Sequence, residues 1–315
     1  MRSAATLIQL RAFVAAAATG SFGQAAIVLG LSPSSVSESV KALEHLHGQP
    51  LFRRSPRGIT LTPAGEQGLY YAQLVVQHSE DFALAVDERR ALEGSLTVAT
   101  FRSLGVHLLP PVLALLRRRH PRLQVRIIDG TLGAGGEQLV QDGQADVAFL
   151  ELGAPTSLFT LPVVQDDYVA VRVRAEEGQP LSVATLRAQP LLVFPAEHAC
   201  NAGLHRHLHS FLLPGTVVQE IADDEVMLSM VEHRLGLAVM PRLAVLPLRE
   251  SLTMSPLPVA LSRTLGVAMK PGRPGLPHLR AFVEALRAYQ TTPAFADLQA
   301  LVGAHAPEHE TQALR

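Results

Sequence analysis

Residues 21–44 constrain the fold more than any other part of this 315-residue chain. A helix–turn–helix needs small side chains where two helices cross, a tight turn, and a polar outer face on the second helix. Ala25 and Ala26 are small, and Gly30 permits the turn. Ser21 can cap the first helix, and Ser32 and Pro33 supply a capping residue and a favoured first residue to the second. We therefore expect one helix over 22–29 and a second from Pro33 onward.

The second helix should have one buried and one exposed side. Val36, Val40 and Leu43 recur at i, i+4 and i+7 and should face inward. The opposite side carries hydroxyl and charged groups, which can hydrogen-bond the edges of bases in the major groove of double-stranded DNA. The residues predicted to contact DNA from this segment are Ser32, Ser34, Ser35, Ser37, Glu38 and Lys41.

A basic turn follows the second helix. Arg53, Arg54 and Arg57 lie between a strand that begins at Leu51 and its return at 59–61, and we expect them to contact phosphate or the minor groove. Residues 1–62 have a net charge of +4 and the remainder −5, which favours a polyanion-binding head on an acidic body. The alternative interpretation is a helical bundle with a solvated basic loop.

A long helix is predicted over 63–92, because Thr62 and Pro63 form a helix start. An apolar series within it recurs at 4-3-4-3, the spacing of a packed helix pair. The residues predicted to form a dimer contact are Tyr71, Val75, His78, Phe82 and Ala85. Alternatively, this face packs on the helix's own domain.

From Ser95 onward the pattern alternates strands and helices, which predicts an α/β domain with largely parallel sheets. Strands are expected over 96–99, 123–128, 146–150, 168–173, 191–194, 217–220, 237–240 and 265–269. Helices are expected over 106–119, 138–141, 198–212, 224–233 and 279–289. Residues 291–315 are rich in Ala, Pro, Glu and His and are expected to form a flexible tail.

The first 65 residues closely resemble the LysR-type transcriptional regulators. The matching residues are Leu10, Phe13, Gly20, Ser21, Phe22, Ala25, Ala26, the run Leu31 to Ser37, Val40 to Glu44, Leu51 to Arg54 and Leu61 to Gly65. The family often has a basic or amide side chain where this chain has Glu38. A carboxylate there repels phosphate, so we expect Glu38 to contribute specificity, unless it pairs with Lys41 or an arginine.

The resemblance implies a domain layout and an assembly. It implies a winged helix–turn–helix over 1–62, a linker helix over 63–92, and an effector domain over 93–290 with two lobes like those of periplasmic binding proteins. Lobe I would take residues 93–162 and 264–290, and lobe II residues 163–263. It further implies dimers, usually paired into tetramers, on two neighbouring promoter sites. Binding of the effector would reposition the DNA-binding domains and thereby change the contact with RNA polymerase.

A small organic effector is expected between the lobes, where strand ends meet helix starts. Several loops there offer donors and one cation to an anion, and the resemblance places effector contacts at similar positions. The predicted effector residues are Thr100, Arg102, Ser103, Thr131, His198 and Asp223. Arg102 could equally be a surface salt-bridge partner, and the glycine-rich loop at 130–136 a connector that lacks the P-loop ending.

Cys200 is the single cysteine, which excludes an internal disulfide framework and fits a reducing cytoplasm. Its position near a predicted helix start raises the alternative of a redox or electrophile sensor. With His205 and His209 it could also bind zinc, although a solvated histidine face is the simpler interpretation.

Other function classes fit less well. No nucleophile elbow, metal-binding helix motif or P-loop occurs, so an α/β enzyme with a helical appendage would leave the basic head unexplained. A solute-binding protein is disfavoured by the same head and by the absence of a signal-peptide or transmembrane pattern. We expect no catalytic residue, cofactor, metal or membrane partner.

Overall fold

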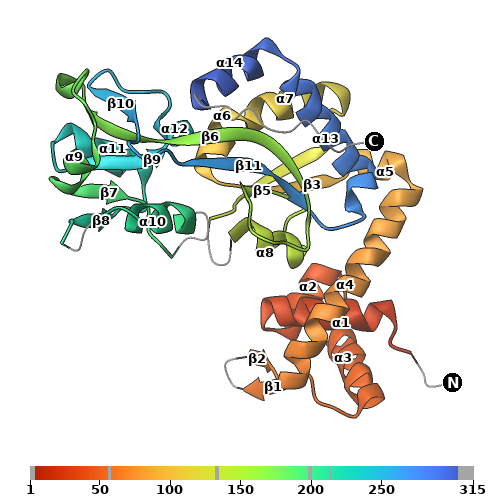
Figure 1. Cartoon of the computed structure of the whole chain (residues 1–315). Coiled ribbons are helices and arrows are strands. Elements are labelled where there is room, and N and C mark those ends of the chain that lie inside the picture. Colours follow the sequence, from red (N-terminus) through yellow and green to blue (C-terminus); the bar gives the residue numbers. More distant parts are fainter. Residues whose placement is uncertain (1–3, 56–57, 132–134, 198–200, 213–214, 304–315) are drawn as a thin grey trace. The chain divides into compact units, whose positions relative to one another are not determined.

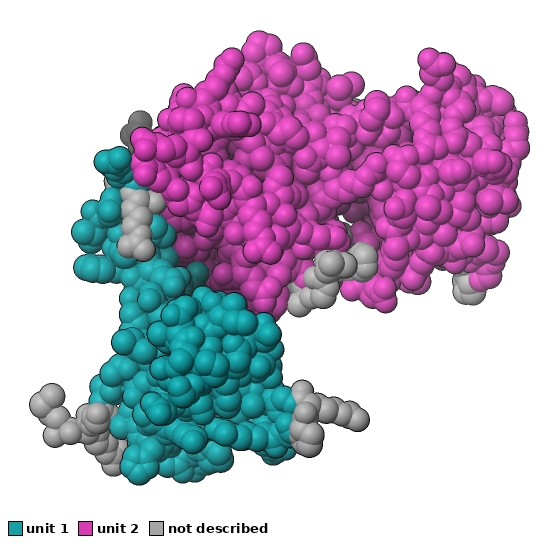
Figure 2. All heavy atoms as spheres, turned by 180° about the vertical axis from the view of Figure 1, so that it is seen from behind, with its two compact units in different colours: residues 1–91 teal, residues 92–315 magenta. Residues whose placement is uncertain are grey.

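The computed structural model describes residues 4–55, 58–131, 135–197, 201–212 and 215–303. The chain divides into two compact units, residues 1–91 (unit 1) and 92–315 (unit 2), which are coloured separately in Figure 2. None of the helices in the described ranges is long and apolar enough to cross a membrane.

Unit 1 has the predicted helix–turn–helix with a two-stranded wing (Figure 1). Its elements are α1 (Leu7–Thr19), α2 (Phe22–Leu29), α3 (Pro33–His47), β1 (Phe52–Ser55), β2 (Gly58–Leu61) and α4 (Pro63–Val86). The predicted caps are confirmed, because the hydroxyls of Ser21, Ser32 and Thr62 each accept a backbone N–H three residues later. Val36, Val40 and Leu43 are buried, as their spacing predicts.

The wing is fixed to the helices by close backbone contacts. Ile59 N donates to the carbonyl of Gly20 at 3.0 Å, and Phe52 packs edge-on against both Phe13 and Phe22. A Cβ on Gly65 would lie 2.2 Å from the carbonyl oxygen of Leu51, so only glycine lets α4 start this close to the wing. The predicted helix over 63–92 is interrupted at Asp87, and α5 (Glu88–Leu92) follows.

Unit 2 contains one long sheet that runs through two lobes, in the order β4-β3-β5-β11-β6-β9-β7-β8, with β10 paired to β6. Lobe I carries β3 (Ser95–Thr100), β4 (Gln124–Asp129), β5 (Val147–Leu152) and β11 (Ser262–Met269). Lobe II carries β7 (Leu191–Val193), β8 (Val218–Glu220), β9 (Leu237–Pro241) and β10 (Leu252–Pro256). The strand β6 (Phe159–Val173) passes through both lobes.

The expectation of largely parallel sheets is wrong at the centre of the sheet. β11 is antiparallel to both β5 and β6, and β6 is antiparallel to β9 and β10. The reason is that β6 carries the chain from lobe I into lobe II while β11 carries it back, so the two crossing strands run in opposite directions. The first half of β6 and all of β10 were not predicted.

Helices cover the faces of this sheet (Figure 1). They are α6 (Arg102–His107), α7 (Leu109–Arg119), α8 (Gly135–Gln141), α9 (Val183–Arg187), α10 (Ala202–His209), α11 (Asp224–Glu232), α12 (Arg242–Val245), α13 (Pro277–Gln290) and α14 (Pro293–Val302). The lobe I core surrounds Leu96, Phe149 and Phe282, and the lobe II core has Leu191 on one side of the sheet and Met227 on the other.

The C-terminal segment is not loose where the structure describes it. α14 starts at a Thr292 cap and buries Phe295, Leu298 and Val302 in the lobe I core, with the rings of Phe295 and Tyr289 5.4 Å apart. These apolar residues recur at i, i+3 and i+7, a helical period that the high Ala and Pro content of this segment obscures. Residues 304–315 lie outside the described ranges.

Candidate DNA interface and effector cavity

The outer side of α3 carries the polar groups that the sequence predicts. Ser34, Glu38 and Lys41 are exposed, while Ser35 and Ser37 are half-buried. The hydroxyl of Ser32 accepts the backbone N–H of Ser35 at 3.1 Å and hydrogen-bonds the hydroxyls of Ser34 and Ser35. The first turn of α3 therefore presents an ordered cluster of hydroxyls beside two exposed charged side chains.

The two glutamates of α3 have different environments. Glu44 accepts the backbone N–H groups of Leu51 and Phe52 at 2.8 and 3.2 Å, so it fixes the start of the wing. Glu38 forms no ion pair with any described residue, so the alternative of a pair with Lys41, Arg53 or Arg54 is not seen, and Arg57 lies outside the described residues. Its carboxylate is therefore free to accept a hydrogen bond from outside the chain.

The wing and α3 form one continuous surface. Arg53 and Arg54 are exposed, and Arg54 Nη2 lies 3.4 Å from the hydroxyl of Ser37. The Arg54 guanidinium also lies 5.2 Å from the centre of the Phe22 ring. Arg57 lies outside the described residues. The basic residues of the wing thus lie next to the polar side of α3.

One side of α4 exposes large apolar groups. Tyr71 and Phe82 are 68% and 72% exposed, and Val75 is also exposed. His78 and Ala85, from the same predicted series, are exposed as well. Apolar side chains that repeat at this spacing and remain in solvent mark a surface that another helix covers.

A cavity of about 420 Å³ lies at the boundary between the lobes of unit 2. Five predicted effector residues line it, namely Thr100, Arg102, Ser103, Thr131 and Asp223. His198 lies outside the described residues. The cavity has the size of a small-molecule site and collects groups from α6, β4 and the start of α11, which supports the predicted location.

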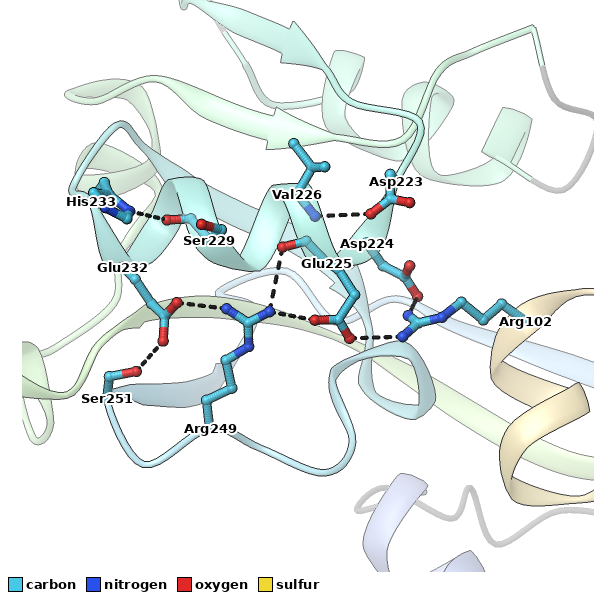
Figure 3. Close-up of polar contacts among 10 residues, drawn as sticks. All are labelled: Arg102, Asp223, Asp224, Glu225, Val226, Ser229, Glu232, His233, Arg249 and Ser251. Carbon is cyan, nitrogen blue, oxygen red and sulfur yellow. Dashed lines mark hydrogen bonds and ion pairs between the residues drawn. The ribbon is translucent and has the colours of Figure 1, made fainter.

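Arg102 joins the two lobes through ion pairs instead of facing the cavity as a free cation (Figure 3). It lies at the start of α6 in lobe I and pairs with Asp224 and, at 2.7 Å, with Glu225 at the start of α11 in lobe II. These two carboxylates raise the pKa of Arg102, mainly through their hydrogen bonds. The salt-bridge alternative for Arg102 therefore describes this structure.

A buried arginine that the sequence analysis missed also lines the cavity. Arg263 on β11 donates through Nε and Nη2 to Asp166 on β6 at 3.1 and 2.9 Å, and Leu243 N donates to the second oxygen of Asp166. The Arg263 guanidinium lies 5.4 Å from the Phe101 ring centre and 5.7 Å from that of Tyr168. The pair links the two strands that cross between the lobes. The sequence signal that could have indicated this buried pair is Arg263 itself, a charged residue next to the apolar run of β11.

The charged groups that line this cavity are Arg102, Arg263, Asp129, Asp223 and Asp224. Both arginines are already paired with carboxylates. Thr131 is also engaged, because its N–H and hydroxyl donate to Asp129 at 2.8 and 2.6 Å. An anion that entered the cavity would therefore meet two arginines that are already paired and three carboxylates, those of Asp129, Asp223 and Asp224.

The histidines near residue 200 bond to the backbone. The ring Nε2 atoms of His205 and His207 lie 2.7 and 2.9 Å from the carbonyl oxygens of Phe194 and Val259. Within the ranges that the structure describes, no group of three potential metal ligands is found. Cys200 lies outside those ranges, so the structure says nothing of the thiol.

A winged helix–turn–helix followed by a long helix and a two-lobed α/β domain is the architecture of a DNA-binding transcriptional regulator. Comparison with known sequences identifies the family. Residues 7–66 match the bacterial regulatory helix-turn-helix proteins of the lysR family, and residues 89–291 match the LysR substrate binding domain. The chain belongs to the LysR family of transcriptional regulators, so the resemblance seen in the sequence is confirmed.

Relatives agree with this assignment over most of the chain. It is 34% identical over 290 residues to the probable HTH-type transcriptional regulator LrrA of Synechococcus elongatus, which covers 91% of this chain and 97% of the relative. It is 36% identical over 182 residues to a probable hydrogen peroxide-inducible genes activator of Mycobacterium xenopi, covering 56% of this chain and 93% of that one.

Solved structures share the fold at lower identity. A full-length OxyR variant from Pseudomonas aeruginosa has a TM-score of 0.75 at 20% identity, over 97% of this chain and 100% of that one. Full-length CbnR in complex with its target DNA has a TM-score of 0.58 at 21% identity, over 90% and 99% of the two chains. The predicted fold class is therefore confirmed: an N-terminal winged helix–turn–helix, a linker helix and a two-lobed α/β domain.

Proposed function

We propose that unit 1 recognises promoter DNA with α3 in the major groove and the wing on the adjoining backbone. The observation that carries this proposal is the continuous exposed surface of Ser34, Glu38 and Lys41 with Arg53 and Arg54. Hydroxyl and charged side chains read base edges, whereas arginines of a wing contact phosphate or the minor groove. Arg57 would extend the same basic surface.

We propose that two copies pair through the exposed side of α4. The residues involved would be Tyr71, Val75, His78, Phe82 and Ala85. In such a dimer the two winged helix–turn–helix domains would bind two half-sites of DNA. Two dimers would then bind neighbouring promoter sites. Because its target is DNA, we place the protein in the cytoplasm. We propose that it contacts RNA polymerase at the promoter and that it catalyses no reaction.

Unit 2 would bind a small organic effector at the boundary between the lobes and thereby change the promoter complex. An effector shifts such an equilibrium only if it binds one lobe arrangement more tightly than the other. The ion pairs from Arg102 to Asp224 and Glu225 hold the lobes in the arrangement seen here. An effector that alters these pairs would alter the lobe arrangement and the spacing of the heads.

Footprinting of purified protein on the DNA upstream of its own gene and of a divergent neighbour tests the assignment. We expect protection of two adjacent sites, weakened by rising salt because phosphate contacts release counterions. Lys41→Ala should lose the protection, whereas Arg126→Ala, an exposed position on β4 in unit 2, should keep it. Equal protection by both variants would contradict the proposed interface.

A second candidate signal is oxidation of Cys200. Relatives named as probable hydrogen peroxide-inducible genes activators match 56% and 61% of this chain, and a lone thiolate can be oxidised by peroxide to a sulfenic acid with release of hydroxide. A Cys200→Ser variant whose footprint still responds to peroxide would remove this candidate.

A further inference from the structure

A second cavity, of about 300 Å³, adjoins the first and shares Arg102, Ser103 and Asp224 with it. Its remaining wall is largely apolar, formed by Val106, Leu228, Leu243, Val245, Leu246 and Pro247. Besides the shared groups, its polar residues are Glu225, Arg249 and His107, whose Nε2 lies 3.0 Å from the carbonyl oxygen of Leu246. The second cavity thus combines an apolar wall with two guanidinium groups that are paired with the carboxylates of Asp224 and Glu225.

The carboxylate of Glu225 occupies the position between these two guanidinium groups (Figure 3). One oxygen accepts from Arg102 Nη2 at 2.7 Å, and the other pairs with Arg249 Nη2. Arg102 comes from lobe I, and Arg249 from the segment before β10 in lobe II. The arrangement shows directly how this site holds a carboxylate: one arginine for each oxygen.

Glu225 is the member of this cluster that can leave most easily. Its side chain is 54% exposed, whereas that of Asp224 is only 10% exposed. The other partners would remain in place, because Asp224 pairs with Arg102 while Glu232 pairs with Arg249 at 2.5 Å. Glu225 can turn into water without breaking those two pairs.

We propose that this second cavity binds a small amphipathic carboxylate, and that the ligand's carboxylate displaces Glu225 from between Arg102 and Arg249. The exchange replaces one carboxylate by another, so the charge between Arg102 and Arg249 stays the same. An anion that entered the first cavity would instead add a negative charge beside its aspartates. The ligand binds more tightly than Glu225 because its apolar body is buried against Val106, Leu228 and Leu246. Glu225 acts as an internal competitor for the site.

The consequence for regulation rests on the proposed effector function of unit 2. Glu225 connects Arg102 of lobe I with Arg249 of lobe II. When the ligand replaces it, the link between Arg102 and Arg249 runs through the ligand, while the pair between Asp224 and Arg102 remains. Occupancy of the site is thereby coupled to the contact between the lobes.

Calorimetric titration of the full-length chain with isovalerate, hexanoate and phenylacetate tests the binding step. We expect Glu225→Gln to bind at least one of them roughly tenfold more tightly than the wild type, because the competitor has lost its charge. Arg249→Ala should weaken binding roughly tenfold or more. Arg249→Lys, which keeps the charge but loses the forked geometry, should weaken it as well and serves if the alanine variant does not fold.

Matched controls identify the cavity and the ligand class. Asp129→Asn changes a residue that lines only the first cavity and is not among the predicted effector residues, and the asparagine oxygen can still accept from Thr131, so binding should stay unchanged. The neutral isovaleramide should not bind, and inorganic phosphate should bind more weakly than the carboxylates.

Several results would overturn the proposal. One is a Glu225→Gln variant that binds no better than the wild type. Another is absence of binding to that variant at about 10 mM ligand. A third is a loss of binding in Asp129→Asn but not in Arg249→Lys. Phosphate that binds as well as the carboxylates would reduce the site to a general anion site. Binding that is intact but leaves the footprint unchanged would contradict the proposed effector function and not the ligand site.

Discussion

Arg54 of the wing reaches back to α3, where its Nη2 lies 3.4 Å from the hydroxyl of Ser37 while its guanidinium covers the Phe22 ring. An arginine held in this way positions a side chain on the recognition surface, in addition to any phosphate contact of its own. Arg53 has an exposed side chain and no such partner among the described residues, so the two neighbours should act differently on DNA.

We expect Arg54→Ala to reduce discrimination between the best and altered promoter sequences by about tenfold, because Ser37 loses its support. Arg53→Ala should instead weaken binding to all sequences alike and lower the salt slope by about one unit. Binding assays at several salt concentrations on matched and altered sites measure both quantities. Identical behaviour of the two variants would contradict the positioning role of Arg54.

Glu38→Gln should relax base preference without loss of affinity. The carboxylate has no ionic partner in the described part of the chain. The substitution replaces a pure acceptor, which can accept from cytosine, by a group that both donates and accepts. Selection of binding sites from a random pool measures the preference. A binding-site profile identical to that of the wild type would exclude base recognition by Glu38.

Charges placed on the apolar side of α4 should separate the dimer. Val75→Glu combined with Phe82→Glu buries two like charges in the proposed contact, and we expect at least tenfold weaker self-association. Glu66→Gln, at the start of the same helix, is the control. Sedimentation at graded concentrations gives the dissociation constants, and an unchanged dimer would show that another surface pairs the copies.

The buried pair between Asp166 and Arg263 should matter more for stability than any surface ion pair. Arg263→Met leaves the Asp166 carboxylate buried without its partner, which costs about 3–5 kcal/mol. Adding Asp166→Leu to that variant should restore much of the loss. Urea unfolding of the three proteins provides the comparison, and a double variant no more stable than the single one would contradict this explanation.

Acid should weaken the ion-pair cluster around Arg249. Hydrogen bonds from Arg102 and Arg249 hold the pKa of Glu225 below its usual value, and Ser251 and Arg249 do the same for the pKa of Glu232. Carboxyls with a lowered folded-state pKa stabilise the fold fully above their unfolded pKa of about 4.3, and this contribution is lost as the pH falls through the folded-state pKa.

The melting temperature of Glu225→Gln should therefore be lower than that of the wild type near pH 7, and the difference should shrink as the pH falls below about 4.3. Thermal unfolding monitored by circular dichroism from pH 7 to well below about pH 4.3 checks the trend. A difference that is constant across the range would show that Glu225 contributes through packing and not through its charge.

The predictions that held are those in which a local pattern carries the information. Ser21, Ser32 and Thr62 cap the helices that follow them, since a capping hydroxyl acts three residues away. The exposed α3 face and the apolar side of α4 follow from helical periodicity. Thr100, Arg102 and Thr131 follow strand ends and line one cavity, while their contact with an effector stays a prediction.

The amino-acid sequence alone determined the helix–turn–helix, the wing, the linker helix and the family of this protein. Tertiary structure decided the direction of the central strands, the pairing of Arg263 with Asp166 and the partners of Arg102. Glu225 lies 123 residues from Arg102, and Asp166 lies 97 residues from Arg263. Neither periodicity nor spacing can relate residues so far apart, because only the crossing of β6 and β11 between the lobes brings them together.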